Sequence, residues 1–177
     1  EKIRNMLHAS KSAGALKVGF LLVPNFSMVA FSCAIEPLRS ANRMSGCELF
    51  SWVIAGSTGE TVIASNGVVV RTDGRPELLQ DCRLVFACAG LDVKTQSTKE
   101  TLNVIRRLDR NGAIVGAICT GTYLMAAAGL LDERRCTIHW ENIDGLAEEF
   151  PHLDITNELF EIDDSRITCS GGTASLD

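Results

Sequence analysis

The sequence has few prolines, no long apolar run and no excess of basic residues. Only four of its 177 residues are proline. No apolar run approaches the ~20 residues that a membrane-spanning helix needs, so no membrane contact is expected. The formal net charge is −5, whereas phosphate contacts need clustered Lys and Arg. This part of the chain is therefore not expected to bind nucleic acid.

The seven cysteines lack the spacing of a metal site or of a disulfide framework. They are odd in number, widely spread and never in a C-x-x-C arrangement, and only three histidines accompany them. A reduced, cytoplasmic protein with no metal and no cofactor fits best. Residues 1–15 carry charges where a signal peptide would need an apolar core, and we interpret them as a flexible leader.

Residues 16–177 are long enough for one domain, and 46% of the sequence is hydrophobic. Strand-like and helical patterns alternate along it. The expected strands are 17–23, 50–57, 84–89 and 113–118; the expected helices are 28–43, 97–110, 120–128 and 141–150; a short strand or turn is expected at 137–139, and hairpins at 59–74 and 159–170. The alternation predicts an α/β fold, with a mostly parallel sheet sandwiched by helices as in flavodoxin-like proteins, and with antiparallel additions.

Cys119 lies where a buried strand pattern changes into a helical pattern. A thiol at that join is near the first turn of a helix, where free N–H groups and the helix dipole favour a thiolate. Gly116 and Gly121 flank it and permit a tight turn. The arrangement is that of a nucleophile elbow with cysteine at its tip. The alternative is that Cys119 is a small buried hydrophobic residue.

Ligands of open α/β sheets bind outside the carboxyl ends of the strands. We therefore expect the segments at Val23, Gly90, Cys119 and His139 to share a crevice. Backbone N–H groups near Ala89 and Gly90 could stabilise an oxyanion, and His139 is the only plausible base, although a structural role is equally compatible with a lone histidine. No acidic partner for the thiol is obvious.

Three segments together carry a resemblance to a known family. They are FLLVPNFSMVAFSCAIEPLRSANR (20–43), AICTGTYLMAAAGLLDERRCTIHWE (117–141) and CSGGTASLD (169–177). They resemble the amidotransferase-like domain, of the PfpI superfamily, at the N-terminus of many AraC-family transcriptional regulators. The resemblance implies a homodimeric sensor of a small metabolite such as glycine betaine, a carnitine derivative or arginine. It also implies a helix-turn-helix DNA-binding region beyond residue 177.

The resemblance extends to only some catalytic positions. Cys119 matches the elbow cysteine of the superfamily, and Ala89 and Gly90 match its oxyanion loop with one substitution. Thr120 stands where PfpI-type proteases have histidine, and Ala30 where many members have an acidic residue; Glu36 lies later and does not replace it. These losses favour ligand binding over turnover.

The expected ligand site contains Cys119, Thr120, His139, Trp140, Glu141, Phe31, Ala89 and Gly90. Trp140, Phe26, Phe31 and Tyr123 could offer aromatic faces to a quaternary ammonium group, and Glu141 a compensating charge. The alternative is that Trp140 and Phe31 pack helices or a dimer. Besides the sensor, a hydrolase or deglycase using Cys119 with His139, and a redox sensor that oxidises Cys119, stay open.

Overall fold

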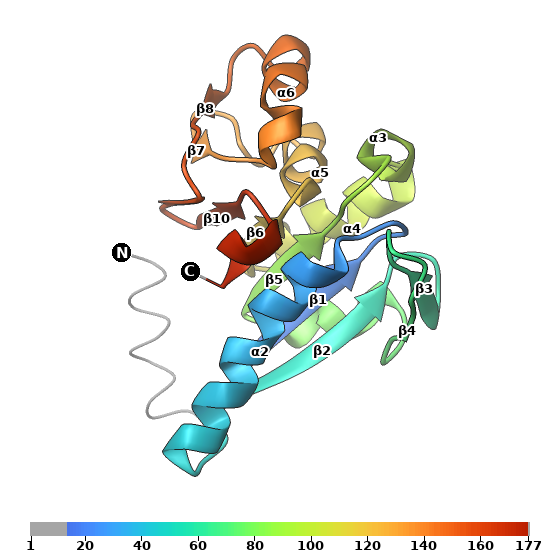
Figure 1. Ribbon diagram of the computed structural model, residues 1–177, viewed down its shortest axis with the longest axis vertical. Coiled ribbons are helices and arrows are strands. Elements are labelled where there is room, and N and C mark those ends of the chain that lie inside the picture. The colour runs from blue at the N-terminus through green and yellow to red at the C-terminus, as the bar shows by residue number, and fades with distance from the viewer. Residues whose placement is uncertain (1–13, 177) are drawn as a thin grey trace.

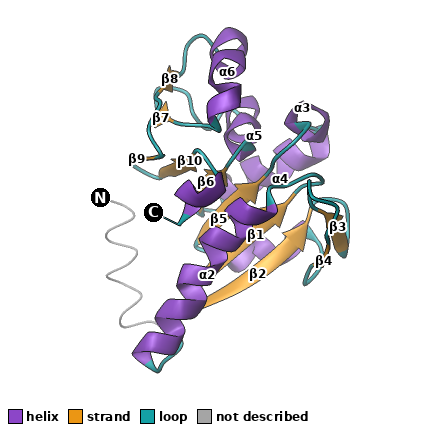
Figure 2. Cartoon of the chain, in the orientation of Figure 1, coloured by secondary structure: helices purple, strands orange, loops and turns teal. Residues whose placement is uncertain are grey.

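The computed structural model describes residues 14–176, which form a three-layered α/β fold (Figures 1 and 2). The central sheet has six strands in the order β2-β1-β5-β6-β10-β9. Every pair of neighbours is parallel except β9 with β10. The strands are β1 (Leu16–Leu22), β2 (Phe50–Gly56), β5 (Leu84–Cys88), β6 (Ile114–Ile118), β9 (Phe160–Asp163) and β10 (Arg166–Cys169). The predicted fold class is confirmed.

Helices cover both faces of this sheet. One face packs against α2 (Met28–Ser45), which crosses in front of β1 and β2 in Figure 1. The other face packs against η1, α4, α5 and α6 through a larger apolar cluster. The bounds are η1 (Pro76–Asp81), α3 (Val93–Gln96), α4 (Lys99–Arg110), α5 (Gly121–Ala127), η2 (Trp140–Asn142), α6 (Ile143–Glu149) and η3 (Gly172–Ser175).

Local sequence signals explain where the long helices begin and end. The Ser27 hydroxyl accepts a hydrogen bond from the Ala30 N–H (3.4 Å) and caps α2. Gly46 ends this helix in the left-handed conformation (φ 70°), which costs glycine little. The Thr98 hydroxyl caps α4 in the same way, through the Thr101 N–H (3.2 Å).

Both predicted hairpins are present. β3 (Thr61–Ile63) pairs antiparallel with β4 (Val69–Arg71), and the turn between them includes Asn66 and Gly67. β9 and β10 form the second hairpin, and β10 also pairs parallel with β6.

Two local expectations were wrong, and some short elements were not predicted. Residues 137–139, expected as a short strand or turn, form neither; the strand is β7 (Arg135–Cys136), paired with an unpredicted β8 (Asp154–Ile155). The expected helix at 141–150 divides into η2 and α6, and α3 had not been predicted at all. Two- to four-residue elements are too short to produce a periodic pattern. Of the proposed leader, residues 1–13 lie outside the described residues, and among residues 14–176 no helix is both long and apolar enough to cross a membrane.

Arg106 connects α4 to the end of the helix that follows the elbow. Its guanidinium donates to the carbonyls of Ala127 and Ala128, both at 3.0 Å, and thereby caps the carboxyl end of α5. We expect Arg106→Ala to lower the free energy of unfolding by about 1–2 kcal/mol, because two charge-assisted hydrogen bonds are lost. Arg107 makes only a partly exposed ion pair with Glu77 (3.4 Å), so Arg107→Ala should lower the free energy of unfolding by less than about 0.5 kcal/mol. Urea denaturation of the two variants measures the difference. Equal effects would contradict this role of Arg106.

Candidate functional site

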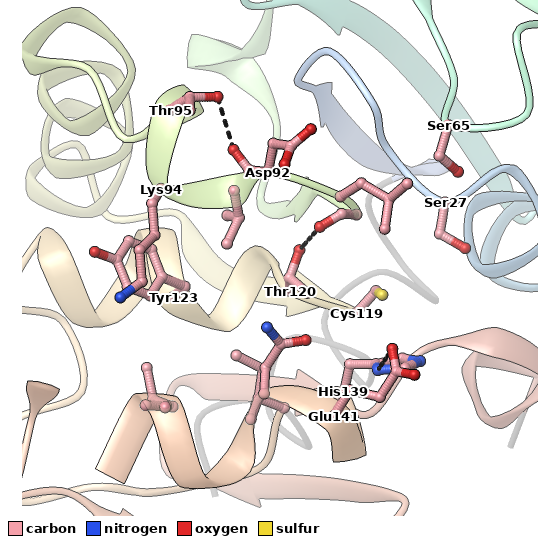
Figure 3. Close-up of a pocket in the computed structure, with 17 residues that line it drawn as sticks. Ser27, Ser65, Asp92, Lys94, Thr95, Cys119, Thr120, Tyr123, His139 and Glu141 are labelled. Carbon is pink, nitrogen blue, oxygen red and sulfur yellow. Dashed lines mark hydrogen bonds and ion pairs between the residues drawn. The ribbon is translucent and has the colours of Figure 1, made fainter. Parts of the chain in front are cut away.

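A cavity of about 500 Å³ opens at the carboxyl edge of the sheet (Figure 3). Ser27 follows β1, Gly90 follows β5 and Cys119 follows β6, so three neighbouring strands contribute to its wall. The rest of the wall comes from the β3–β4 turn, α3, α5 and the η2–α6 segment. The lining residues are Ser27, Ser65, Gly90, Leu91, Asp92, Val93, Lys94, Thr95, Cys119, Thr120, Tyr123, Ile138, His139, Glu141, Asn142, Gly145 and Leu146. The cavity lies at the edge where ligands of open α/β sheets bind.

The predicted elbow at Cys119 is present in the backbone. Cys119 has a φ of 60°, which is uncommon for a residue with a side chain. A Cβ on Gly121 would lie only 2.1 Å from the Ala87 carbonyl oxygen, so the first turn of α5 presses directly onto β5. The Cys119 N–H donates to the Cys169 carbonyl (3.1 Å) and ties the bend to β10. The strand, the bend and the helix are thus held in one arrangement.

Three of the five residues with a side chain and a positive φ among residues 14–176 lie in segments around the cavity; the other two are Glu133 and Asp164. Asn25 (φ 62°), Asp92 (φ 56°) and Cys119 have left-handed conformations in the segments that follow β1, β5 and β6. Asn and Asp adopt this conformation more readily than other residues with a side chain, so Cys119 carries most of the strain. Strained residues of this kind cluster at binding and catalytic sites, which supports a functional role of this edge.

The thiol of Cys119 faces the cavity but is poorly ionised. Only 5% of the residue is exposed, and this burial raises the pKa of the thiol to about 11. The Thr120 N–H lowers the pKa, while Cys169 and Glu141 raise it further; burial has the largest effect. The thiolate expected from the helix dipole is therefore not favoured. α5 has only seven residues, and the dipole and the N–H groups do not offset the loss of hydration.

No general base or acid is in hydrogen-bond contact with this thiol in the part of the chain that the structure describes. His139 lines the cavity, but its Nδ1 approaches Glu141 Oε2 at 3.7 Å. Thr120 stands where PfpI-type proteases have histidine. Its hydroxyl donates to the Gly90 carbonyl (2.6 Å) and thereby holds the segment after β6 against the segment after β5. Ala30 is fully buried, and Glu36 pairs with Arg39 (2.7 Å) on the exposed side of α2.

The structure brings together five of the eight predicted ligand-site residues. Gly90, Cys119, Thr120, His139 and Glu141 line the cavity, whereas Ala89, Phe31 and Trp140 do not. Ala89 is buried beside the loop, and its carbonyl accepts a hydrogen bond from the Ser27 N–H (3.3 Å).

The aromatic cage of the sequence prediction does not form. Phe31 belongs to the inner face of α2 and packs edge-on against Phe20 and Phe26, with ring centroids 5.4 and 5.8 Å apart. Trp140 is 68% exposed and lies beside His139 rather than over the cavity. Tyr123 alone of the four proposed aromatic residues lines the wall.

The sequence did not reveal the polar residues at and just before α3. Asp92, Lys94 and Thr95 line the cavity, and Lys94 is the only Lys or Arg among the lining residues that the structure describes. The available signal was their place directly after the strand that ends at Cys88, since the carboxyl-end rule applies to the whole connecting segment.

The chain matches the DJ-1/PfpI family over residues 17–177. It is 48% identical over 158 residues to the HTH-type transcriptional regulator CdhR of Pseudomonas aeruginosa, covering 89% of this chain and 47% of that protein. It is 40% identical over 173 residues to the HTH-type transcriptional regulator GlxA of Rhizobium meliloti, covering 97% and 53%. The chain therefore spans about half the length of these curated relatives.

A solved structure of a transcriptional regulator is also similar to this chain. The crystal structure of an AraC family transcriptional regulator from Pseudomonas putida is similar with a TM-score of 0.80 at 26% identity, covering 90% of this chain and 86% of that one.

Proposed function

Because the chain belongs to the DJ-1/PfpI family and its curated relatives are HTH-type transcriptional regulators, we propose that it is the effector-binding and dimerisation domain of an AraC-family transcriptional regulator. The effector is a small cytoplasmic metabolite that enters the cavity over Cys119. Its binding shifts the arrangement of two subunits, and with it a helix-turn-helix region outside this sequence, through different affinities for two states.

The observation that supports sensing over catalysis is a cavity of ligand size whose thiol has no hydrogen-bonded base or acid among the described residues. A cavity of about 500 Å³ is within the range of small-molecule sites. The thiol at its wall has a pKa raised to about 11, and none of the described carboxylates or imidazoles forms a hydrogen bond with it. Groups that recognise a ligand are thus present, while the groups that would move a proton are not assembled.

The charges in the wall indicate the class of effector. Asp92 and Glu141 supply two carboxyl groups, and Lys94 supplies one ammonium group. The proposed effector therefore carries a cationic group together with a carboxylate, as glycine betaine, a carnitine derivative or arginine does. Tyr123 provides one aromatic face; a complete aromatic cage is not part of the proposal.

Isothermal titration of glycine betaine, L-carnitine and arginine tests the proposal. At least one should bind at millimolar or lower concentration, and Glu141→Gln should weaken its binding about three- to tenfold, because a charge facing the cationic group is lost. Asp144→Asn removes an exposed charge that does not line the cavity, and it should leave the affinity unchanged. No binding of any of the three compounds would contradict the proposed effector class.

The second candidate is a cysteine-dependent hydrolase or deglycase that uses Cys119 and His139. The strained elbow (φ 60°) favours it. This candidate requires turnover of ester, peptide or glyoxal substrates that Cys119→Ser abolishes. We expect no such turnover from the wild-type protein.

A further inference from the structure

A carboxylate of the protein itself connects two walls of the cavity. Glu149, at the end of α6, accepts a hydrogen bond from the Tyr123 hydroxyl through one oxygen (2.6 Å) and pairs with Lys94 Nζ through the other (2.6 Å). Lys94 lies on α3, and Tyr123 lies on α5. We name these three residues the clasp. It joins α3 and α6, whose residues face each other across the cavity (Figure 3).

The clasp uses the cavity groups that are best suited to bind a carboxylate. Among the described residues, Lys94 is the only Lys or Arg in the lining, and its ammonium lies 5.7 Å from the Tyr123 ring centroid. The Tyr123 hydroxyl is held as a donor, since burial and the contact with Glu149 raise its pKa to about 12. Glu149 itself does not line the cavity. It is therefore a carboxylate of the protein that reaches two lining groups from outside.

The ion pair is suited to exchange its carboxylate partner. The Lys94 side chain is 67% exposed and that of Glu149 is 38% exposed. Such solvated pairs are weak and depend on the salt concentration. A ligand carboxylate that is fixed by other contacts in the cavity can compete with Glu149 at little cost.

We propose that Lys94 and Tyr123 form the carboxylate subsite of the effector and that, in the empty protein, Glu149 holds both of these groups from outside the cavity. Binding exchanges one carboxylate for the other and releases the end of α6 from α3. The inference rests on the proposed function and adds to it both a subsite and a way for binding to move a wall of the cavity. Phe150, which packs edge-on against Tyr123 (5.7 Å), extends the effect to the residue that follows α6.

The test pairs each zwitterion with an analogue that lacks the carboxylate. Glycine betaine is compared with choline, and arginine with agmatine, by titration into wild type, Glu149→Gln, Lys94→Gln and Glu148→Gln. Glu148 is the matched control, because it is the exposed neighbour of Glu149 on the same helix. Hydrogen exchange of α6 is measured on the same proteins.

Removing the internal competitor should tighten binding of the zwitterion about two- to fivefold in Glu149→Gln, which corresponds to the strength of an exposed ion pair. The affinity for choline or agmatine should not change. Lys94→Gln should weaken binding of the zwitterion at least tenfold and leave that of the analogue within twofold. Glu148→Gln should match wild type throughout. Hydrogen exchange in α6 should be faster in Glu149→Gln than in Glu148→Gln.

The outcomes separate the inference from the proposed function. If a zwitterion binds wild type but Glu149→Gln and Glu148→Gln behave alike, the clasp is wrong and the effector site stands. Equal losses of zwitterion and analogue in Lys94→Gln would also overturn the carboxylate subsite. If none of the four compounds binds any variant, and L-carnitine does not bind either, the proposed effector class fails, and the inference fails with it.

Discussion

Replacing Gly121 by alanine should lower the free energy of unfolding by about 3 kcal/mol. A Cβ at this position would lie 2.1 Å from the Ala87 carbonyl oxygen and 3.0 Å from its carbon, both of which belong to the backbone of β5. A strand in the centre of the sheet cannot rotate away as a flexible side chain can. Either β5 or the first turn of α5 must shift, and the elbow shifts with it.

Gly145 provides the matched control, since it is also a helical glycine near the cavity. A Cβ there meets nothing within 4 Å, and the residue lies in the middle of α6. Gly145→Ala should therefore stabilise the protein by up to about 1 kcal/mol, because alanine loses less backbone entropy in a helix. Urea denaturation of the two variants measures the difference. Equal stabilities would show that α5 does not press onto β5.

The second large effect concerns the reactivity of Cys119. At pH 7.5 its thiolate fraction should be on the order of 100-fold below that of an ordinary thiol, because burial raises the pKa of the group to about 11. Iodoacetamide should therefore label Cys119 on the order of 100-fold more slowly than it labels the exposed Cys47. Peptide mass spectrometry after timed labelling gives both rates in one experiment.

The dependence of this rate on pH follows from the direction of the shift. Because its pKa is raised, the Cys119 thiol stays protonated to a higher pH in the folded protein than in the unfolded chain. The rate of labelling should therefore rise with pH until about pH 11. Cys119→Ser should remove the slow label and leave the label on Cys47. Labelling of Cys119 as fast as that of Cys47 near neutral pH, or rapid sulfenate formation in mild peroxide, would favour the enzyme or the redox sensor.

Much of the fold could be predicted because long elements leave long patterns. The spacing of Met28, Phe31, Ile35 and Leu38 predicted α2, and the joined strand and helix patterns predicted the elbow at Cys119. The same spacing places Phe31 toward the sheet, which is where the structure has it. The predicted aromatic cage conflicted with that pattern, and the pattern was correct.

The site could be predicted only in part, because its remaining residues depend on short and distant segments. α3 has four residues and shows no periodicity, so Asp92 and Lys94 had no predicted place. The contact between Lys94 and Glu149 joins α3 to α6, between which the chain forms α4, β6, α5, β7 and η2, and spacing along one element cannot reveal it. The thiol pKa also depends on burial, which the sequence does not quantify.

The central claim is that the cavity over Cys119 binds a small metabolite and leaves it chemically unchanged. A titration of the ¹⁵N-labelled domain with glycine betaine, L-carnitine and arginine, followed by two-dimensional NMR, measures binding at the cavity and the integrity of the ligand in one sample. The account predicts saturable shifts of the amides of Gly90, Lys94 and Thr120 with at least one compound, whose own signals stay constant for hours. Shifts at none of these amides, or consumption of the compound that Cys119→Ser abolishes, would contradict it.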